Sequence, residues 1–450
     1  MFDKILIANR GEIAVRIIRA CRELGVRTVA VFSEADRGAL HAQIADEAIC
    51  IGPAATKDSY LNVKAILAAC ELTGAQAVHP GFGFLSENAA FARNCERCGV
   101  TFIGPLAESI DLMGDKAQAK KTMKDAGVPV VPGSEGVVKS IEEGKQIAAD
   151  IGYPIMVKAS AGGGGRGIRL VNSENELEAA MTAAQQEALN FFGNDEVYIE
   201  KFIVNPRHVE IQILADTHGN VVHLGERDCS MQRRNQKVLE ESPCPVMTEE
   251  LRAKMGDAAI KAAKACNYRN AGTIEFLLSG NDFYFMEMNT RIQVEHPVTE
   301  LVTGIDLVKH QILIAAGEKM NLCQEDIKLS GHAIECRINA ENPYFNFRPS
   351  PGKITALHMP GGPGVRIDSA VYQGYVISPH YDSMIAKLIV YAPTRTEAIK
   401  KMKWALAEFL VEGVDTNIDF QLNLLRDENF ENATYDIGYL SRTQIMKQPK

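Results

Sequence analysis

Five polar residues occupy alternate positions near the middle of the chain, and their types suit a site for a cation beside a small anion. Mostly apolar residues stand between them, and the five are Glu287, Asn289, Arg291, Gln293 and Glu295. Such alternation predicts a β-strand with side chains on two faces, which we expect to end at His296 and Pro297. A half-buried strand with a solvated face is the alternative interpretation.

A predicted hairpin precedes this segment. Residues 272–278 and 283–287 are rich in aromatic and branched side chains, and Ser-Gly-Asn-Asp lies between them. A three-residue loop would place Glu275 opposite Glu287, where like charges repel, and a loop that differs by one residue would move Glu275 only to the neighbouring pair. A hard cation such as Mg²⁺ or Mn²⁺, bound by oxygen atoms of Glu275, Glu287 and Asn289, would remove that repulsion. A solvent-screened carboxylate pair is the alternative.

A glycine run is the candidate phosphate site. Lys158 precedes Gly162, Gly163, Gly164 and Gly165, and apolar runs at 153–157 and 168–171 flank the loop as predicted strands. The glycines therefore cap a hairpin, unlike the strand-to-helix loops of P-loop and dinucleotide folds. We expect backbone N–H groups to meet phosphate and the loop to act as a mobile lid, although a plain flexible tip has the same composition.

Together these residues resemble the set found in biotin carboxylases of the ATP-grasp superfamily. The similarity runs nearly end to end and includes the blocks at 5–14 and 79–88. Its other parts are Lys116, Lys158, the four glycines, Glu200 to Ile203, His208, residues 231–237, Glu275, residues 287–297 and Arg337.

The predicted fold class is α/β. Strand, helix and strand patterns at 4–8, 12–24 and 28–32 indicate a parallel sheet, prolines and a glycine at 129–133 indicate a linker, and residues 333–339 alternate again. The resemblance implies an ATP-grasp fold with four parts. They are a Rossmann-like domain (1–114), a linker and lid domain (115–203), a catalytic region (204–330) and a C-terminal α+β domain (331–450).

The resemblance also implies a reaction and a role for each residue. ATP phosphorylates bicarbonate to carboxyphosphate, which carboxylates biotin. Glu295 takes the proton of bicarbonate, Arg337 stabilises the biotin enolate, and Glu275, Glu287 and Asn289 bind the metal. Bicarbonate would be held by Lys237, Arg291, Gln293 and the backbone of Val294. The nucleotide would be held by Lys116, Lys158, Gly162, Gly163, Gly164, Gly165, Glu200, Lys201, Phe202, Ile203, His208, Gln232 and Leu277.

Two positions depart from the common family pattern. Many relatives have His at the position of Asn235 and Tyr at the position of Phe82. We therefore leave Asn235 out of the nucleotide contacts and assign no hydroxyl role at position 82.

Length, charge and cysteine content exclude several other classes of function. A chain of 450 residues suggests about three domains, and a net charge of −9 without a Lys/Arg block argues against nucleic acid as a partner. No leader or membrane span is evident, so we expect a cytoplasmic protein with no membrane partner. The ten cysteines include one close pair, Cys95 and Cys98, without a second pair at zinc spacing, which predicts free thiols.

The source of biotin follows from a missing motif. Carrier domains in this family present the acceptor lysine between two methionines, and residues 401–404 do not match that pattern. The resemblance therefore implies a separate biotin carboxyl carrier protein, carboxyltransferase subunits and a homodimer, with Arg16, Arg19 and Glu23 as candidate dimer contacts. The chain resembles the free-standing carboxylases of acetyl-CoA carboxylase in fatty acid synthesis.

Three alternatives remain at this point. The chain could serve a two-chain pyruvate or other acyl-CoA carboxylase. It could be an ATP-grasp amide ligase or a carbamoyl-phosphate type of synthase, although Arg337 and the complete 291–295 run favour biotin. A regulator that binds nucleotide without catalysis would not need the full set of acid, base and metal residues.

Overall fold

The computed structural model describes residues 1–159, 168–192 and 195–446. The chain forms two compact units. The first holds Met1–Val128, Arg207–Phe276 and the chain from Glu287 onward, and the second holds Pro129–Pro206 and Leu277–Met286. The second unit begins where the prolines predicted a linker. The division into four domains at 114, 203 and 330 stays a prediction.

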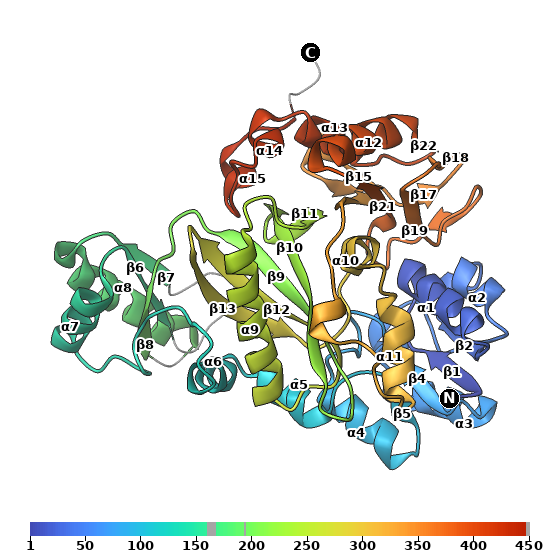
Figure 1. The fold of residues 1–450 in the computed structure, drawn as a ribbon, viewed down its shortest axis with the longest axis horizontal. Coiled ribbons are helices and arrows are strands. Elements are labelled where there is room, and N and C mark those ends of the chain that lie inside the picture. The colour runs from blue at the N-terminus through green and yellow to red at the C-terminus, as the bar shows by residue number, and fades with distance from the viewer. Residues whose placement is uncertain (160–167, 193–194, 447–450) are drawn as a thin grey trace. The chain divides into compact units, whose positions relative to one another are not determined.

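A five-stranded parallel sheet opens the first unit, in the order β3-β2-β1-β4-β5 (Figure 1). Its strands are β1 (Lys4–Ile7), β2 (Arg27–Phe32), β3 (Glu47–Cys50), β4 (Ala77–His79) and β5 (Thr101–Phe102). The helices of this region are α1 (Gly11–Glu23), α2 (Leu40–Ile44), α3 (Val63–Thr73), α4 (Ala89–Arg97), α5 (Ala107–Gly114) and α6 (Lys116–Asp125). The predicted strand, helix and strand at the start of the chain are confirmed.

Both faces of this sheet are covered by helices, and β1 is apolar and buried from Ile5 to Ile7. Ile5 packs in one core with Ile13 of α1, while Leu6 points to the other face and packs with Ile66 of α3. Neighbouring side chains of a strand point to opposite faces, so a continuous apolar run is what a parallel sheet between two helix layers requires.

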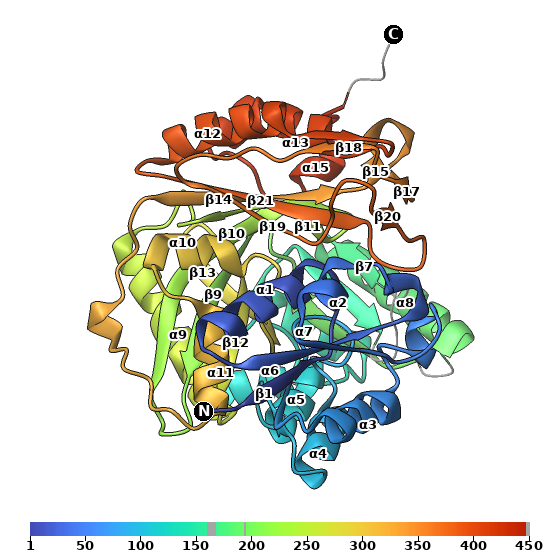
Figure 2. The ribbon, with the colours of Figure 1, turned by 90° about the vertical axis from the view of Figure 1, so that its right-hand side faces the viewer.

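An eight-stranded sheet forms the rest of the framework, in the order β13-β12-β9-β10-β11-β14-β21-β19 (Figure 2). Its strands are β9 (Arg207–Ala215), β10 (Val221–Arg233), β11 (Gln236–Ser242), β12 (Asn270–Ser279), β13 (Asp282–Asn289), β14 (His332–Asn339), β19 (Val365–Ser369) and β21 (Met384–Ala392). The alternation predicted at 333–339 is confirmed, since Ile334, Cys336 and Ile338 all lie in the core.

Helices pack on this sheet. They are α9 (Glu249–Ala265), α10 (His296–Thr303), α11 (Leu307–Ala315), α12 (Arg395–Glu408), α13 (Ile418–Leu425), α14 (Glu428–Glu431) and α15 (Tyr439–Arg442). Figure 2 shows α12 and α13 over β14 and β21, where Leu388 packs against Met402 and Leu424. Short strands complete this end of the chain: β15 (Glu341–Asn342), β16 (Arg348–Pro349), β17 (Gly352–Lys353), β18 (Ala356–His358), β20 (Val376–Ile377) and β22 (Leu410–Glu412).

The prediction of one strand from 287 to 295 is wrong. Strand β13 ends at Asn289, residues 290–295 form a loop, and Glu295 is the N-cap residue of α10. His296 and Pro297 begin this helix. Proline has a helical φ and lacks only an N–H that a first turn leaves unpaired, so the sequence signal fits a helix start equally well.

The hairpin between β12 and β13 is also tighter than the loop considered from sequence. Only Gly280 and Asn281 separate the two strands, and Gly280 has φ +61°. The loop is one residue shorter than the one that places Glu275 opposite Glu287.

The second unit contains a three-stranded antiparallel sheet in the order β7-β6-β8. Its elements are β6 (Ile155–Ala159), β7 (Ile168–Val171), β8 (Val197–Lys201), α7 (Ile141–Ile151) and α8 (Glu174–Phe192). Val157, Met181 and Ile199 pack between the sheet and these helices. The strands predicted around the glycine loop are confirmed, since Lys158 pairs with Ile168. The four glycines lie outside the described residues.

No helix in the described part of the chain combines the length and apolarity needed to cross a membrane.

Candidate active site

Lys237 forms the centre of a buried cluster of carboxylates. It enters from β11, and its Nζ atom lies 2.7 Å from Glu210, 2.9 Å from Glu275 and 2.6 Å from Glu295. Burial acts to lower the pKa of this amine, but Glu210 and Glu295 raise it well above its ordinary value. Lys237 is therefore an ammonium that holds three acidic side chains together.

Glu295 lies between two cations. Its Oε1 atom accepts from Lys237, and its Oε2 atom accepts from Arg337 of β14 at 3.0 Å. Burial acts to raise the pKa of Glu295, but Lys237, Arg337 and Arg227 bring it well below its ordinary value. The side chain is thus a buried carboxylate that can take a proton once its cationic partners are drawn elsewhere.

Arg337 is held in place by a further acid. Its Nε atom donates to Glu240 of β11 at 2.7 Å, and Glu240 is fully buried. Burial raises the pKa of Glu240 to about 7, and Glu295 acts in the same direction against the opposing effect of Arg337. The hydrogen bond from Arg337 to Glu240 holds the guanidinium beside Glu295.

Arg227 of β10 forms hydrogen bonds with several side chains of the site. It is fully buried and donates to Glu210 at 2.5 Å, to Gln212 at 2.7 Å and to Gln293 at 2.8 Å. Gln293 in turn donates to Glu275 at 2.8 Å. A guanidinium has five N–H donors in a fixed plane, so this one residue sets the positions of strand and loop side chains together.

Sequence reasoning missed Glu210, Arg227 and Glu240. The available signal was the alternation at the start of β9, where His208, Glu210 and Gln212 share one face between apolar neighbours. All of β9 is buried, so these polar groups must find partners inside the protein. Arg227 lies opposite Glu210 in the register of β9 and β10 and supplies one of them.

Arg291 pairs with residues other than those of the Lys237 cluster. Its Nε atom donates to Glu87 at 2.9 Å, and a terminal nitrogen donates to Asn289 at 2.9 Å. The predicted strand had placed Arg291 and Gln293 on one face. In the structure Arg291 pairs with Glu87 and Asn289, whereas Gln293 pairs with Arg227 and Glu275. Of the predicted anion site, the structure brings Gln293, Glu295, Lys237 and Arg337 together.

The predicted metal ligands are oxygen donors on two neighbouring strands. Glu275 of β12 is buried against Lys237, Gln293 and His208, whereas Glu287 of β13 is partly exposed and lies 3.8 Å from Lys116. The Nδ2 atom of Asn289 is buried and has no hydrogen-bond partner among the described residues. Two carboxylates and an amide oxygen fit the hard-ligand preference of Mg²⁺.

Two other groups of side chains have metal-like spacing. His208, Glu210 and Glu275 form one, and Glu210, Cys229 and Glu295 form the other, with their ligating atoms within 4.8 Å of one another. The ammonium of Lys237 already contacts Glu210, Glu275 and Glu295, so every carboxylate of both groups is paired. Of the ligands predicted from the sequence, Glu275 is paired in this way, whereas Glu287 lies 3.8 Å from Lys116 and Asn289 accepts from Arg291 at 2.9 Å.

The nucleotide candidates of the first unit are Lys116, His208 and Gln232. Lys116 is the first residue of α6 and is exposed. His208 Nδ1 contacts Gln232 at 2.8 Å, and His208 Nε2 lies 3.2 Å from Glu275. The histidine thus connects the candidate nucleotide residues to the candidate metal ligand Glu275.

The second unit contributes a separate group. Lys158 of β6 donates to Glu200 of β8 at 2.6 Å, and Lys201 donates to the carbonyls of Gly152 and Tyr153. The backbone of Phe202 donates to Pro154, while Ile203 and Leu277 are partly buried.

The two departures from the family pattern have local explanations. Asn235 occupies the turn between β10 and β11 with φ +63°, a left-handed conformation that Asn tolerates well. Phe82 packs against the apolar core of the N-terminal sheet, and its backbone carbonyl accepts from Asn9 at 2.8 Å.

Three domain families match the chain in order. Residues 1–110 match the biotin carboxylase N-terminal domain, residues 115–323 match the ATP binding domain of the carbamoyl-phosphate synthase L chain, and residues 335–442 match the biotin carboxylase C-terminal domain.

Full-length relatives agree with these matches. Biotin carboxylase 1 of Bacillus subtilis is 60% identical over 99% of this chain and 100% of that protein. A pyruvate carboxylase subunit of Methanothermobacter thermautotrophicus is 56% identical over 96% of this chain and 88% of that protein. A solved structure is also similar, the biotin carboxylase domain dimer of 2-oxoglutarate carboxylase from Hydrogenobacter thermophilus with MgADP, ADP and bicarbonate. It has a TM-score of 0.87 and 52% identity over 98% of each chain.

The fold and these similarities define an ATP-grasp enzyme, an ATP-dependent carboxylase of the ligase class. The chain belongs to the biotin carboxylase family.

Proposed function

We propose that this chain carboxylates biotin on a separate biotin carboxyl carrier protein, using ATP and bicarbonate by way of carboxyphosphate. The observation that carries the proposal is the carboxylate of Glu295 between Lys237 and Arg337, with Gln293 beside it. A base, two cations and an amide in one buried site are the groups needed to bind bicarbonate and remove its proton.

Bicarbonate itself would activate the base. An anion held by Lys237, Arg291, Gln293 and the backbone of Val294 competes with Glu295 for cationic partners. Those partners keep the pKa of Glu295 low. As they turn to the substrate, the carboxylate becomes a stronger base at the moment that the proton must leave.

The nucleotide and metal contacts are part of the same proposal. Magnesium, or manganese, would be bound by Glu275, Glu287 and Asn289, and it supplies neutralisation of phosphate charge. The proposed nucleotide contacts are those that the family resemblance implies: Lys116, His208, Gln232, Leu277, Lys158, the glycines 162–165 and residues 200–203.

Arg337 would act in the second part of the reaction. Once carboxyphosphate breaks down to CO2 and phosphate, the phosphate can take the proton of the biotin ureido nitrogen. The guanidinium of Arg337, fixed by Glu240 at 2.7 Å, then stabilises the enolate oxygen.

The carboxyl acceptor proposed is acetyl-CoA, with carboxyltransferase subunits as further partners in a cytoplasmic acetyl-CoA carboxylase. The 60% identity to Biotin carboxylase 1 of Bacillus subtilis supports it. The 56% identity to a pyruvate carboxylase subunit supports the second candidate, in which the same half-reaction serves another acceptor.

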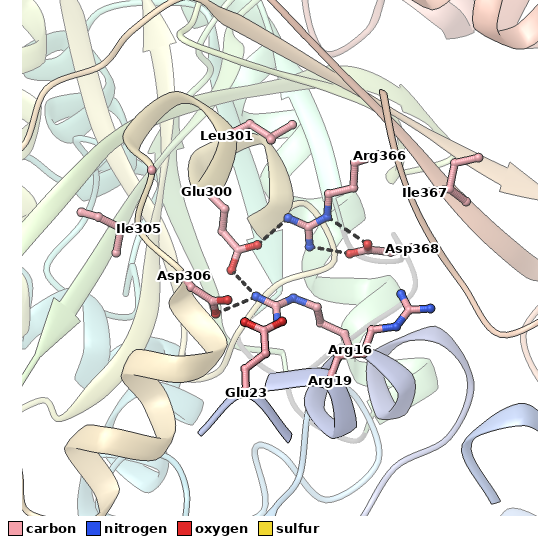
Figure 3. A pocket seen from close by; sticks show the side chains of 11 residues that line it. Arg16, Arg19, Glu23, Glu300, Leu301, Ile305, Asp306, Arg366, Ile367 and Asp368 are labelled. Atoms are coloured by element: carbon pink, nitrogen blue, oxygen red, sulfur yellow. Dashed lines mark hydrogen bonds and ion pairs between the residues drawn. The ribbon is translucent and has the colours of Figure 1, made fainter. Parts of the chain in front are cut away.

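A homodimer is proposed from a surface groove of about 380 Å³ (Figure 3). Arg16 pairs with Glu300 and Asp306, and exposed Arg19 and Glu23 extend from the same helix, α1. A two-fold interface buries the same patch of both copies, so a patch with both signs of charge can pair with itself. Arg19→Glu should dissociate the dimer, as measured by sedimentation velocity. An unchanged dimer would show that the interface does not include this groove.

The test of the reaction is ADP release with Mg²⁺, bicarbonate and free biotin varied independently. We expect release to require Mg²⁺ and bicarbonate together and to rise with biotin. ATP hydrolysis that ignores bicarbonate would overturn the assignment. Bicarbonate dependence without a response to biotin would favour a carbamoyl-phosphate type of ligase.

A further inference from the structure

Lys387 of β21 is a fully buried lysine that contacts the candidate reaction loop. Its Nζ atom donates to the backbone carbonyl of Val294 at 2.9 Å. Val294 lies in the loop between Gln293 and Glu295. A lysine is almost never fully buried without partners, so this position requires an explanation.

The partners of Lys387 keep it charged. Nζ lies 3.1 Å from Glu12 of α1 and 3.8 Å from Asp368 of β19. Burial acts to lower the pKa of the amine, but Glu12, Glu335 and Asp368 raise it above its ordinary value. The hydrogen bond to Val294 is therefore charge-assisted, which makes it stronger than a bond between neutral groups.

The anchors of Lys387 are themselves fixed. Asp368 accepts two hydrogen bonds from Arg366, at 2.9 and 2.7 Å, and Arg366 also donates to Glu300 at 2.7 Å (Figure 3). Asp368, the partner of Lys387 on β19, is thus linked through Arg366 to Glu300 of α10.

The loop needs such a contact. Residues 290–295 belong to no helix or strand, so individual contacts must set the orientation of each peptide. Arg227 and Glu275 hold the side chain of Gln293, and Lys237 and Arg337 hold that of Glu295. Lys387 holds the carbonyl between them. Because a peptide is planar, fixing this oxygen also fixes the N–H and the Cα of Glu295, the point from which its side chain leaves the backbone.

We propose that Lys387 is a positioning residue that orients Val294 and Glu295 toward bicarbonate through the carbonyl of Val294. The inference rests on the proposed bicarbonate site. It predicts a defect in the use of bicarbonate and not of ATP.

The test variant is Lys387→Met combined with Glu12→Gln, which removes both members of the closest ion pair and leaves Asp368 with Arg366. Loss of a charge-assisted hydrogen bond should raise the KM for bicarbonate about tenfold or more, while the KM for ATP stays within about twofold. Both constants come from initial rates of ADP release.

Lys4→Met is the matched control. Lys4 is also a buried strand lysine that pairs with a carboxylate, Glu47, and donates to a main-chain carbonyl, that of Thr73, but it lies in β1. Its replacement should lower the unfolding temperature and leave the KM for bicarbonate unchanged. If the first variant does not fold, Lys387→Gln with Glu12→Gln retains a neutral donor and should raise the same KM by a smaller factor.

An unchanged KM for bicarbonate in the Lys387 variant, or an equal rise for bicarbonate and ATP, would overturn the inference. The native protein separates this inference from the proposed function. If native ADP release shows no dependence on bicarbonate, the proposed function fails. If native ADP release depends on bicarbonate and the Lys387 variant has the same KM for bicarbonate as the native protein, only the role of Lys387 fails.

Discussion

The ammonium of Lys237 lies 2.6 Å from Oε1 of Glu295, deep enough that both side chains are largely shielded from water. The contact makes Glu295 a weak base, because its pKa is held well below the ordinary value against the effect of burial. An anionic substrate that attracts Lys237 would release that constraint. The substrate itself would then make the base active.

Glu295→Gln tests the base directly. The amide keeps the shape of the carboxylate and one acceptor oxygen but cannot accept the proton, so biotin-dependent turnover should fall by about 10²–10⁴-fold. ATP affinity, measured by equilibrium binding, should change little. Glu34→Gln, at an exposed acid of the N-terminal region, serves as the control and should keep native turnover. Near-native turnover in Glu295→Gln would assign the proton transfer to another group.

Lys237→Met tests the cation that the three carboxylates share. Removing one partner of a buried ion pair leaves charge without compensation, and we expect a loss of about 3–5 kcal/mol in the free energy of unfolding, measured by urea titration. Lys261→Met removes an exposed pair with Asp257 on α9 and should change stability by less than about 1 kcal/mol. Equal effects of the two substitutions would contradict the role of Lys237 as the centre of the cluster.

Glu287→Gln tests the metal assignment. Glu287 is the more exposed of the two candidate carboxylates and contacts Lys116 only at 3.8 Å, so its loss should disturb the fold little. We expect a rise in the Mg²⁺ concentration needed for half-maximal ADP release, with turnover largely restored at high Mg²⁺. An unchanged Mg²⁺ requirement would remove Glu287 from the ligand set.

Glu241 predicts how stability depends on pH. Its side chain is fully buried, and although burial acts to raise its pKa, His332 and Arg395 bring it from 4.5 to about 2. A carboxyl whose pKa falls on folding stabilises the protein above its unfolded pKa, and this contribution is lost as the pH falls toward the folded pKa. The window is therefore about pH 4.5 to 2.

Urea titrations of native protein and Glu241→Gln at pH 7 and pH 3 measure this contribution. The variant should be less stable by roughly 3 kcal/mol at pH 7, and the difference should shrink at pH 3. Glu34→Gln, at an exposed acid, should show the same small difference at both values. A constant deficit for Glu241→Gln would mean that packing, and not charge, stabilises this position.

Much of the framework could be predicted from local patterns. The apolar run of β1, the amphipathic α1 and the alternation of β14 each follow from periodicity within one element. The loop after Asn289 could not be predicted this way, since alternate polar residues satisfy a strand pattern even where Pro297 begins a helix.

The candidate site was predicted less completely for a related reason. Gln293 and Glu295 were identified by residue type, yet they meet Lys237 through a loop and not through a shared strand face. The alternation in β9 marks Glu210 as a polar residue on a buried strand, but its pairing with Arg227 and the pairing of Glu240 with Arg337 follow only from the arrangement of β9, β10, β11 and β14. The periodicity of one strand does not identify the partners that its residues meet on another strand.

In the proposed reaction, bicarbonate attacks the terminal phosphate of ATP. The direct test uses bicarbonate labelled with ¹⁸O. The reaction runs for a time that is short relative to oxygen exchange between bicarbonate and water, and mass spectrometry then measures the label in the released phosphate. We predict that each phosphate carries one oxygen from bicarbonate, because the bond formed to phosphorus persists when carboxyphosphate breaks down. Phosphate released in a bicarbonate-dependent reaction without the label would contradict this mechanism.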